Sequence, residues 1–401
     1  MSHGLSPARL NRIDAYWRAK YVDTGKLPGA LTLVARRGEI AHLGVVGAAD
    51  IARGVALKED TLFRIYSMTK PLTSVAIMML VEEGAVALDD PVEKFIPAWK
   101  DLGVFVAGGP GRWQTRRPER PMQVVDLLRH TSGLTYGFQD RTAVDAAYRR
   151  AHVGGAGSQM SLSGMIDALA KIPLEFSPGE AWNYSNSTDV LGYLVEAVSG
   201  RSFEDFLRDR VIRPLGMVDT DFHVPADKAA RFAACYALGP NGALALQDDP
   251  AKSPYLAPPP FISGGGGLVS TAADYLAFCR MMLNGGTLDG ERLLSRKTVD
   301  LMTANHLPGG QDLTQLSQSL FSEATLAGVG FGLGFAVTMD PARTLLPGSA
   351  GEYYWGGAAS TAFWIDPAED LIVVFMTQFM PSNYYPLRRE LRTLVYSAFD
   401  D

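Results

Sequence analysis

The pattern of apolar and polar residues predicts a different kind of element at the two ends of the chain than in its middle. Residues from about 8 to 20 are amphipathic with helical spacing, and "GALTLVARRGEIAHLGVVGAAD" (29–50) forms two apolar, β-rich runs around an Arg-Gly turn. Strand-like runs return near the C-terminus as "GFGLGFAVTM", "TAFWIDP" and "DLIVVFMTQF", followed by a final helix in "PLRRELRTLVYSAF". The pattern therefore predicts a sheet built from both ends of the chain.

The middle of the chain has mainly helical patterns. Patches such as "MQVVDLLRHTSGL" and "LSGMIDALAKIPL" are separated by Gly and Pro loops. After "SGGGGLVST" (263–271), helices are expected at about 272–284 and 295–303. We expect an α/β lobe formed by residues 1–85 and 263–401, with residues 86–262 inserted as a mainly helical lobe.

A long apolar helix is predicted inside "IYSMTKPLTSVAIMMLVEEG" (65–84), with Gly84 ending it. The apolar rows of this helix contain Ile65, Met68, Leu72, Ile77, Leu80 and Val81. A helix with such rows is buried on assembly of the fold, so the polar residues in its first turn lose water with it.

Composition excludes several classes of protein. The 401 residues are 47% hydrophobic and 20% charged, which is typical of a folded enzyme, and the net charge of −6 argues against nucleic acid or an anionic membrane as a partner. Cys235 and Cys279 suggest neither a disulfide framework nor a zinc site. The first residues lack the apolar core of a signal peptide, and about 18 uninterrupted apolar residues occur nowhere, so we expect a cytoplasmic protein.

Candidate chemistry lies at the start of the long helix. Ser67 and Lys70 are three positions apart, which brings their Cβ atoms to about 5 to 6 Å on one helical face. The positive end of the helix favours an alkoxide at Ser67, and both this end and burial disfavour an ammonium at Lys70. The pair can therefore make a reactive nucleophile without histidine.

Three further motifs follow in order. They are "LLRHTSGLTYG" (127–137), "FSPGEAWNYSNSTDVLGYLVE" (176–196) and "YYWGGAASTAFWIDP" (353–367). With the Ser-x-x-Lys pattern, the chain resembles the serine β-lactamase and penicillin-binding-protein superfamily, specifically its class C β-lactamase and family VIII carboxylesterase branch. The resemblance implies an α/β (α+β) fold with an antiparallel sheet flanked by helices, a helical lobe, and an active site between them.

The resemblance also implies roles for residues of the second motif. Tyr184 matches the tyrosine of the Tyr-x-Asn motif and would share a proton with Lys70, and which of the two takes the proton of Ser67 stays open. Asn186 would orient Lys70 or the acyl group of the substrate, although a loop asparagine bonded to its own backbone is the alternative. The alternative for Tyr184 is a half-buried tyrosine that caps its loop.

The last motif departs from β-lactamases in a way that changes the expected substrate. Trp355, Gly356 and Gly357 stand where a β-lactamase has a cationic side chain and a hydroxyl for the substrate carboxylate. Trp-Gly-Gly resembles the family VIII esterases and implies neutral esters. By resemblance, the backbone amides of Ser67 and Ala358 form the oxyanion hole. Tyr136 and Trp355 would line the pocket, or could equally be core aromatics.

The expected activity is therefore that of a serine carboxylesterase acting on short-chain esters through an acyl-enzyme at Ser67. A Gly-x-Ser-x-Gly elbow is absent, the six histidines have no metal-like spacing, and no cofactor or metal is required. His130 lies in the cleft loop and is expected to hold its backbone. Alternatives within the fold are a β-lactamase, a D-amino-acid peptidase, an amide hydrolase and an acyltransferase. A non-catalytic binding homologue is a further alternative.

Overall fold

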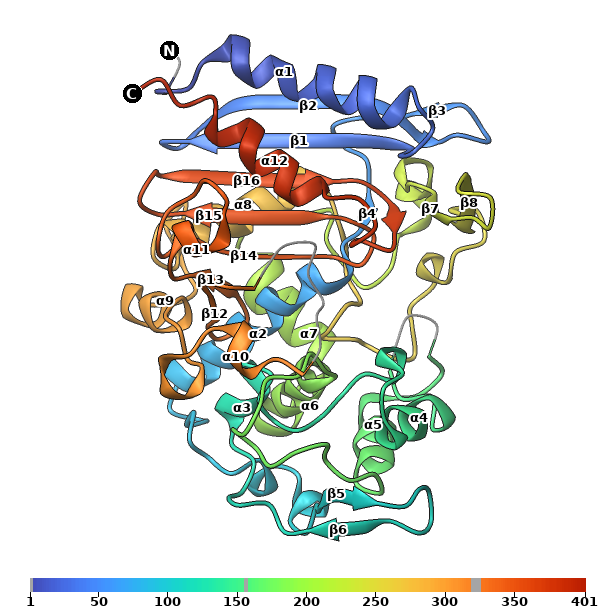
Figure 1. Ribbon diagram of the computed structural model, residues 1–401, viewed down its shortest axis with the longest axis vertical. Coiled ribbons are helices and arrows are strands. Elements are labelled where there is room, and N and C mark those ends of the chain that lie inside the picture. Colours follow the sequence, from blue (N-terminus) through green and yellow to red (C-terminus); the bar gives the residue numbers. More distant parts are fainter. Residues whose placement is uncertain (1–2, 155–157, 319–325) are drawn as a thin grey trace.

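An eight-stranded antiparallel sheet forms the centre of the protein in a computed structural model that describes residues 3–154, 158–318 and 326–401 (Figure 1). The strand order is β12-β13-β14-β15-β16-β1-β2-β3. The strands are β1 (Gly29–Arg36), β2 (Glu39–Asp50), β3 (Val55–Ala56), β12 (Val329–Phe331), β13 (Ala336–Thr338), β14 (Tyr353–Gly356), β15 (Ala362–Asp366) and β16 (Leu371–Met376). The antiparallel pairing of β1 with β16 joins the two ends of the chain, as the sequence pattern predicts.

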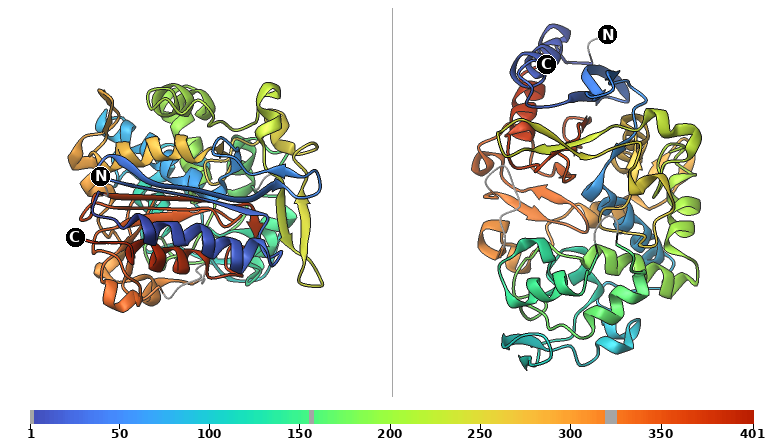
Figure 2. Two further views of the ribbon diagram at one scale, coloured as in Figure 1. Left: turned by 90° about the horizontal axis from the view of Figure 1, so that it is seen from above. Right: turned by 90° about the vertical axis from the view of Figure 1, so that its right-hand side faces the viewer.

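Both faces of the sheet are covered by helices because the central strands are apolar on both sides. All eight residues of β1 are buried. Its Leu31 and Leu33 belong to the core on one face and its Val34 to the core on the other, which is the period of two of a strand. Helices α1 (Pro7–Trp17) and α12 (Leu387–Tyr396) lie side by side over the second face (Figure 2, left). Helix α8 (Ala272–Leu283) packs on the first.

The long helix α2 (Thr69–Glu82) runs through the protein interior, and every residue from 69 to 80 is buried. It follows a single 3₁₀ turn, Tyr66–Met68, and the chain leaves it at Gly84, whose φ of +71° suits glycine. Helix α6 (Ser187–Ser199) packs against it. The predicted helix is therefore confirmed, and Ser67 and Lys70 lie at its N-terminal end.

The other elements surround this core. The remaining helices are α3 (Val124–Leu128), α4 (Ala143–Arg150), α5 (Leu162–Leu169), α7 (Phe203–Leu207), α9 (Arg296–Met302), α10 (Leu313–Leu316) and α11 (Pro341–Thr344). Short strand pairs are β4 (Phe63–Arg64) with β9 (Val269–Ser270), β10 (Thr287–Leu288) with β11 (Glu291–Arg292), and β5 (Val104–Ala107) with β6 (Gln114–Arg116). A three-stranded sheet joins β17 (Phe379–Met380), β7 (Cys235–Leu238) and β8 (Leu244–Asp248).

The segment 86–262 thus contains helices, as expected, and also two hairpins that the apolar pattern does not reveal. The division of the chain into lobes at residues 85 and 263 stays a prediction. No helix among the described residues is long and apolar enough to cross a membrane.

Candidate active site

Ser67 lies in the 3₁₀ turn at the entrance to α2, directly after strand β4. The entry is fixed on both sides, because β4 pairs with β9 and the amide of Ile65 donates to the carbonyl of Leu268 at 3.1 Å. Tyr66 has a φ of +42°, which is uncommon for a residue other than glycine. The first amides of such a helix have no intrahelical acceptor, so the amide of Ser67 is available to a substrate oxygen.

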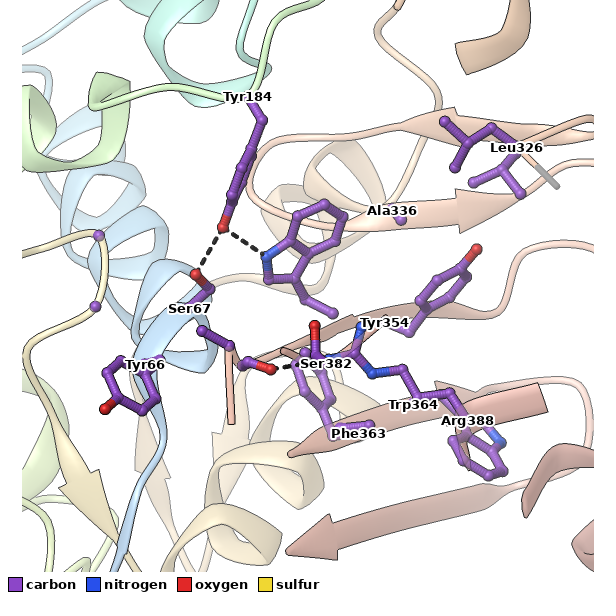
Figure 3. A pocket seen from close by; sticks show the side chains of 18 of the residues that line it. Tyr66, Ser67, Tyr184, Leu326, Ala336, Tyr354, Phe363, Trp364, Ser382 and Arg388 are labelled. Atoms are coloured by element: carbon purple, nitrogen blue, oxygen red, sulfur yellow. Dashed lines mark hydrogen bonds between the residues drawn. The ribbon is translucent and has the colours of Figure 1, made fainter. Parts of the chain in front are cut away.

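Two side chains donate hydrogen bonds to the hydroxyl of Ser67. The phenol of Tyr184 donates to Oγ at 2.7 Å (Figure 3). Nζ of Lys70 donates to the same oxygen at 3.2 Å. The indole Nε1 of Trp355 in turn donates to the phenolic oxygen of Tyr184 at 3.3 Å. Nζ of Lys70 also lies 4.6 Å from the centre of the Tyr184 ring. A negative charge on the phenolic oxygen would therefore be stabilised by an indole N–H and a nearby ammonium.

Lys70 is only 2% exposed, and its amine has two further partners. It donates to the carbonyl of Gly265 at 2.6 Å and to the hydroxyl of Tyr136 at 3.1 Å. Burial, and then the charges of Asp189 and Tyr184, raise the pKa of Tyr136 well above its ordinary value. Tyr136 therefore keeps its proton at neutral pH and serves as a neutral neighbour of the amine.

Ala358 follows strand β14 and lines the same cavity as Ser67. Among the described residues, no acceptor is recorded for its backbone amide. The missing side chain of Gly357 allows the chain to pass close to Ile65, because a Cβ at this position would lie 2.4 Å from the carbonyl oxygen of Ile65. Arg388 of α12 holds the same turn by donating to the carbonyls of Gly357 and Thr361 at 2.9 and 3.1 Å. The segment after β14 therefore packs against the entry to α2, and the oxyanion hole formed by Ser67 and Ala358 stays a prediction.

A cavity of about 260 Å³ opens beside Ser67. Every predicted site residue except Lys70 and Asn186 lines it: Ser67, Tyr136, Tyr184, Trp355, Gly356, Gly357 and Ala358. Its far wall is apolar, with Leu313, Leu326, Val329 and Leu346, and Arg388, Arg389 and Arg392 approach it from α12. The missing side chains of Gly356 and Gly357 make room for Arg388, Thr361 and Ile65.

Asn186 lies apart from the predicted contacts. It is fully buried at the N-cap of α6, and its Nδ2 donates to Asp189 at 2.9 Å. Within residues 3–154, 158–318 and 326–401, the structure records no hydrogen bond between Asn186 and Lys70. The reason is the start of α6, where the side chain turns toward the first helical turn.

His130 lies behind Tyr184, with 5.0 Å between the ring centres. Burial, and then the charge of Lys70, lower the pKa of His130 well below its ordinary value, so the imidazole is neutral. Its Nδ1 is 3.2 Å from Oγ of Ser185, and its carbonyl accepts from the amide of Asn183 at 2.9 Å. These contacts match the expectation that His130 holds the loop.

One group of side chains within the described part of the chain has metal-like proximity, namely Glu204, Asp221 and His223. Arg208 donates to Glu204 at 2.6 Å and to Asp221 at 3.2 Å. A cation of the chain thus already balances these carboxylates, so the group does not indicate a metal centre.

The sequence reasoning missed Asp189, which lines the cavity and is 2% exposed. It accepts hydrogen bonds from Ser263 and Gly265 in the glycine run. The signal in the sequence is the glycine run at 264–267. Asp189, the carboxylate that Gly265 approaches, is distant from that run in sequence.

Comparisons with known proteins agree on one family. A family model described as Beta-lactamase matches residues 17–397. Esterase EstB of Burkholderia gladioli is 32% identical over 390 residues, covering 93% of this chain and 91% of EstB. Protein Rv1367c of Mycobacterium tuberculosis is 39% identical over 362 residues, covering 90% and 88%.

Solved structures have the same fold. EstCE1, described as a hydrolase with promiscuous acyltransferase activity, superposes with a TM-score of 0.80 at 25% identity, covering 97% of this chain and 98% of EstCE1. The LovD6 mutant of simvastatin synthase from Aspergillus terreus has a TM-score of 0.82 at 24% identity, covering 97% of each chain, which is a likeness of fold alone.

Proposed function

Because this chain belongs to the Beta-lactamase family and is a serine hydrolase of that fold, we propose that it is a carboxylesterase acting through an acyl-enzyme at Ser67. The observation that carries the proposal is the arrangement at one oxygen atom. The hydroxyl of Ser67 receives hydrogen bonds from Tyr184 and Lys70 at 2.7 and 3.2 Å beside a mainly apolar cavity. A nucleophilic hydroxyl beside two groups that can exchange a proton with it is what acyl transfer needs.

In the proposed first step, Oγ of Ser67 attacks the ester carbonyl carbon while its proton passes to the Lys70 and Tyr184 pair. The amides of Ser67 and Ala358 stabilise the oxyanion. The bond from carbon to the alcohol oxygen then breaks, and the alcohol leaves with the proton that the pair holds.

In the second step, water attacks the acyl carbon and gives a proton to the same pair. The bond to Oγ breaks, the carboxylic acid is released, and Ser67 regains its proton from the pair. No group beyond the substrate and water is needed for either step to balance.

Neutral esters are the proposed substrate class because of Trp355. On strand β14, its indole occupies the position where a β-lactamase is expected to have an ammonium, and the indole donates a hydrogen bond to Tyr184. Two of the arginines on the far side are already engaged, since Arg388 holds backbone carbonyls and Arg392 is paired with Glu352. The cavity of about 260 Å³ suits a short acyl chain with a small alcohol.

The test is hydrolysis of p-nitrophenyl acetate, butyrate and octanoate beside nitrocefin, for wild type, Ser67→Ala and Trp355→Lys. We expect ester hydrolysis by wild type and a loss of at least about a thousandfold in Ser67→Ala. Little nitrocefin is expected to be cleaved. Faster turnover of nitrocefin than of every ester would contradict the esterase proposal and indicate a β-lactamase.

Transfer of the acyl group to an alcohol is a second candidate, supported by the apolar residues of the cavity lining, which favour an alcohol over water in the cavity. Wild type is incubated with p-nitrophenyl butyrate and 1-butanol, and butyl butyrate is measured against butyrate. Butyl butyrate formed well beyond the molar share of butanol over water supports transfer. Butyrate alone restricts the reaction to hydrolysis.

A further inference from the structure

Asp189 is a buried carboxylate for which the proposed reaction has no assigned role. It occupies the first turn of α6, three residues after the N-cap Asn186. Three donors surround it: Oγ of Ser263 at 2.6 Å, the amide of Gly265 at 2.9 Å, and Nδ2 of Asn186 at 2.9 Å. A buried carboxylate is costly unless hydrogen-bonded, and these donors together with the positive end of the helix stabilise the anion.

Gly265 connects this anion to the amine of the site. Its amide is bound by Asp189, and its carbonyl accepts from Nζ of Lys70 at 2.6 Å. A Cβ at position 265 would lie 2.9 to 3.1 Å from the carboxylate atoms, so only glycine allows this approach. The carboxylate and the ammonium therefore lie on opposite sides of one residue.

The loop that contains Gly265 is also held on α2. Oγ1 of Thr73 donates to the carbonyl of Gly264 at 2.8 Å, and the amide of Leu268 donates to Oγ1 of Thr69 at 3.1 Å. Asp189 supplies the matching attachment from α6. The Gly265 carbonyl is consequently fixed between two helices.

The partners of Lys70 explain why this position matters. Nζ of Lys70 has three polar partners, the carbonyl of Gly265 and the hydroxyls of Tyr136 and Ser67. Only the Gly265 carbonyl is a backbone group, so it sets the direction in which the amine faces Ser67. The other titratable groups around the amine are Tyr136, Tyr184 and His130.

We propose that Asp189 is a positioning residue for ester hydrolysis. It orients Gly265 so that Lys70 faces Ser67, and its charge stabilises the ammonium that forms when Lys70 takes the proton of Ser67. Asn186 contributes through Asp189 rather than by touching Lys70. The inference rests on the proposed esterase function and explains both the glycine at position 265 and the buried asparagine.

The test compares Asp189→Asn with Asp274→Asn by kcat and KM for p-nitrophenyl butyrate from pH 5.5 to 9.5, with melting temperatures. Asp274 is a matched control, because it occupies the same position in α8, is 7% exposed, and accepts from Thr220 and the amide of Asp219 at 2.8 and 2.7 Å. It does not line the cavity.

For Asp189→Asn we expect kcat to fall about 30-fold or more with KM changed less than about threefold, because orientation and charge act on the chemical step. In the plot of kcat against pH, the acidic limb should move to lower pH by about one pH unit, since loss of the negative charge at position 189 disfavours the ammonium form of Lys70. Asp274→Asn should lower the melting temperature without moving the limb. If Asp189→Asn has the same acidic limb and the same kcat as wild type, the inference is overturned.

Ser263→Ala keeps the test decisive if Asp189→Asn does not fold. It removes one donor from the carboxylate, so the less neutralised charge should shift the acidic limb in the opposite direction, to higher pH. An unmoved limb or a shift to lower pH would contradict the role of Asp189. Absence of any Ser67-dependent ester hydrolysis in wild type would instead reject the proposed function itself.

Discussion

Ser67 owes its surroundings to residues that reach it from distant parts of the chain. Lys70 is one helical turn away, whereas Tyr184 comes from the segment just before α6 and Trp355 from strand β14. Trp355 donates to Tyr184, and Tyr184 donates to Ser67, so the three side chains form a continuous chain of hydrogen bonds. The indole therefore acts on the proposed base as well as on the shape of the cavity.

Two cavity glycines should differ sharply in their tolerance of a methyl group. A Cβ at Gly357 would lie 2.4 Å from the carbonyl oxygen of Ile65, whereas at Gly266 the nearest atom is 3.6 Å away. We expect Gly357→Ala to displace Ala358 and lower kcat about 100-fold, which is the loss that follows removal of an oxyanion donor. Gly266→Ala should keep kcat within about threefold. Steady-state kinetics with p-nitrophenyl butyrate measure both, and equal effects would contradict the packing argument.

At this scale, the sequence predicts what is local or carried by a motif. Ser67 and Lys70 meet because they are three residues apart in a helix, and Tyr184 was found through the motif that contains it. Asp189 and Gly265 are 76 residues apart, and no spacing rule joins them. Their contact depends on how α6 and the glycine run are packed, which requires the whole fold.

At the scale of elements, the largely buried carboxyl group of Glu175 connects the segments that carry Tyr136 and Tyr184. Glu175 accepts from Oγ1 of Thr142 at 2.6 Å and from Nδ2 of Asn183 at 3.0 Å, and Nδ2 of Asn183 also donates to the carbonyl of Leu134. Burial, with a further contribution from the charge of Asp145, raises the pKa of Glu175 from 4.5 to about 7.

This raised pKa predicts a pH dependence of stability. The folded state favours the protonated form of Glu175, so its contribution is fully present below about pH 4.5 and is lost as the pH rises through about 7. His130 has the opposite sign, because its lowered pKa removes stability as the pH falls. We therefore expect the difference in melting temperature between Glu175→Gln and wild type to move in favour of the variant from pH 5 to pH 8. A constant difference across this range would show that Glu175 does not titrate there.

The elements that the sequence predicts well are long or strongly apolar. Helix α2 is buried from 69 to 80 and β1 along its whole length, and such runs leave a clear pattern. Strand β6, Gln114–Arg116, is polar and exposed at all its positions, and β8 is mostly exposed. Hairpins of this kind are determined by their turns and neighbours, so hydrophobic periodicity does not reveal them.

At the scale of the whole molecule, Arg64 joins three regions just before the site. Its guanidinium is fully buried and donates to Asp248 and to the carbonyl of Ala233, both at 2.6 Å. It also donates to Gln378 at 3.2 Å and lies 3.9 Å from the ring centre of Phe232. Strand β4, the β7–β8 hairpin and the end of the main sheet are thus connected by one side chain.

Arg64→Leu should destabilise the protein by about 3 to 5 kcal/mol, because it leaves the carboxylate of Asp248 and a buried carbonyl without their donor. Arg53→Leu is the control, since Arg53 also pairs with two carboxylates, Asp50 and Asp249, but its own side chain is 45% exposed, so solvent screens these pairs and a smaller loss of stability is expected. Urea denaturation measures the two variants. Similar unfolding midpoints for both would contradict a connecting role for Arg64.

The pairing of β1 with β16 has a consequence for synthesis on the ribosome. Strand β1 is made early and can pair with β2 at once, yet its other edge waits for residues 371–376. Throughout that interval the nascent chain presents an unpaired edge of a strand that is buried along its whole length in the folded protein, which is a template for association with other chains. Chains that stop short of β16 should therefore aggregate rather than remain as inactive fragments, and chaperones that shield strand edges would matter most in the last part of translation.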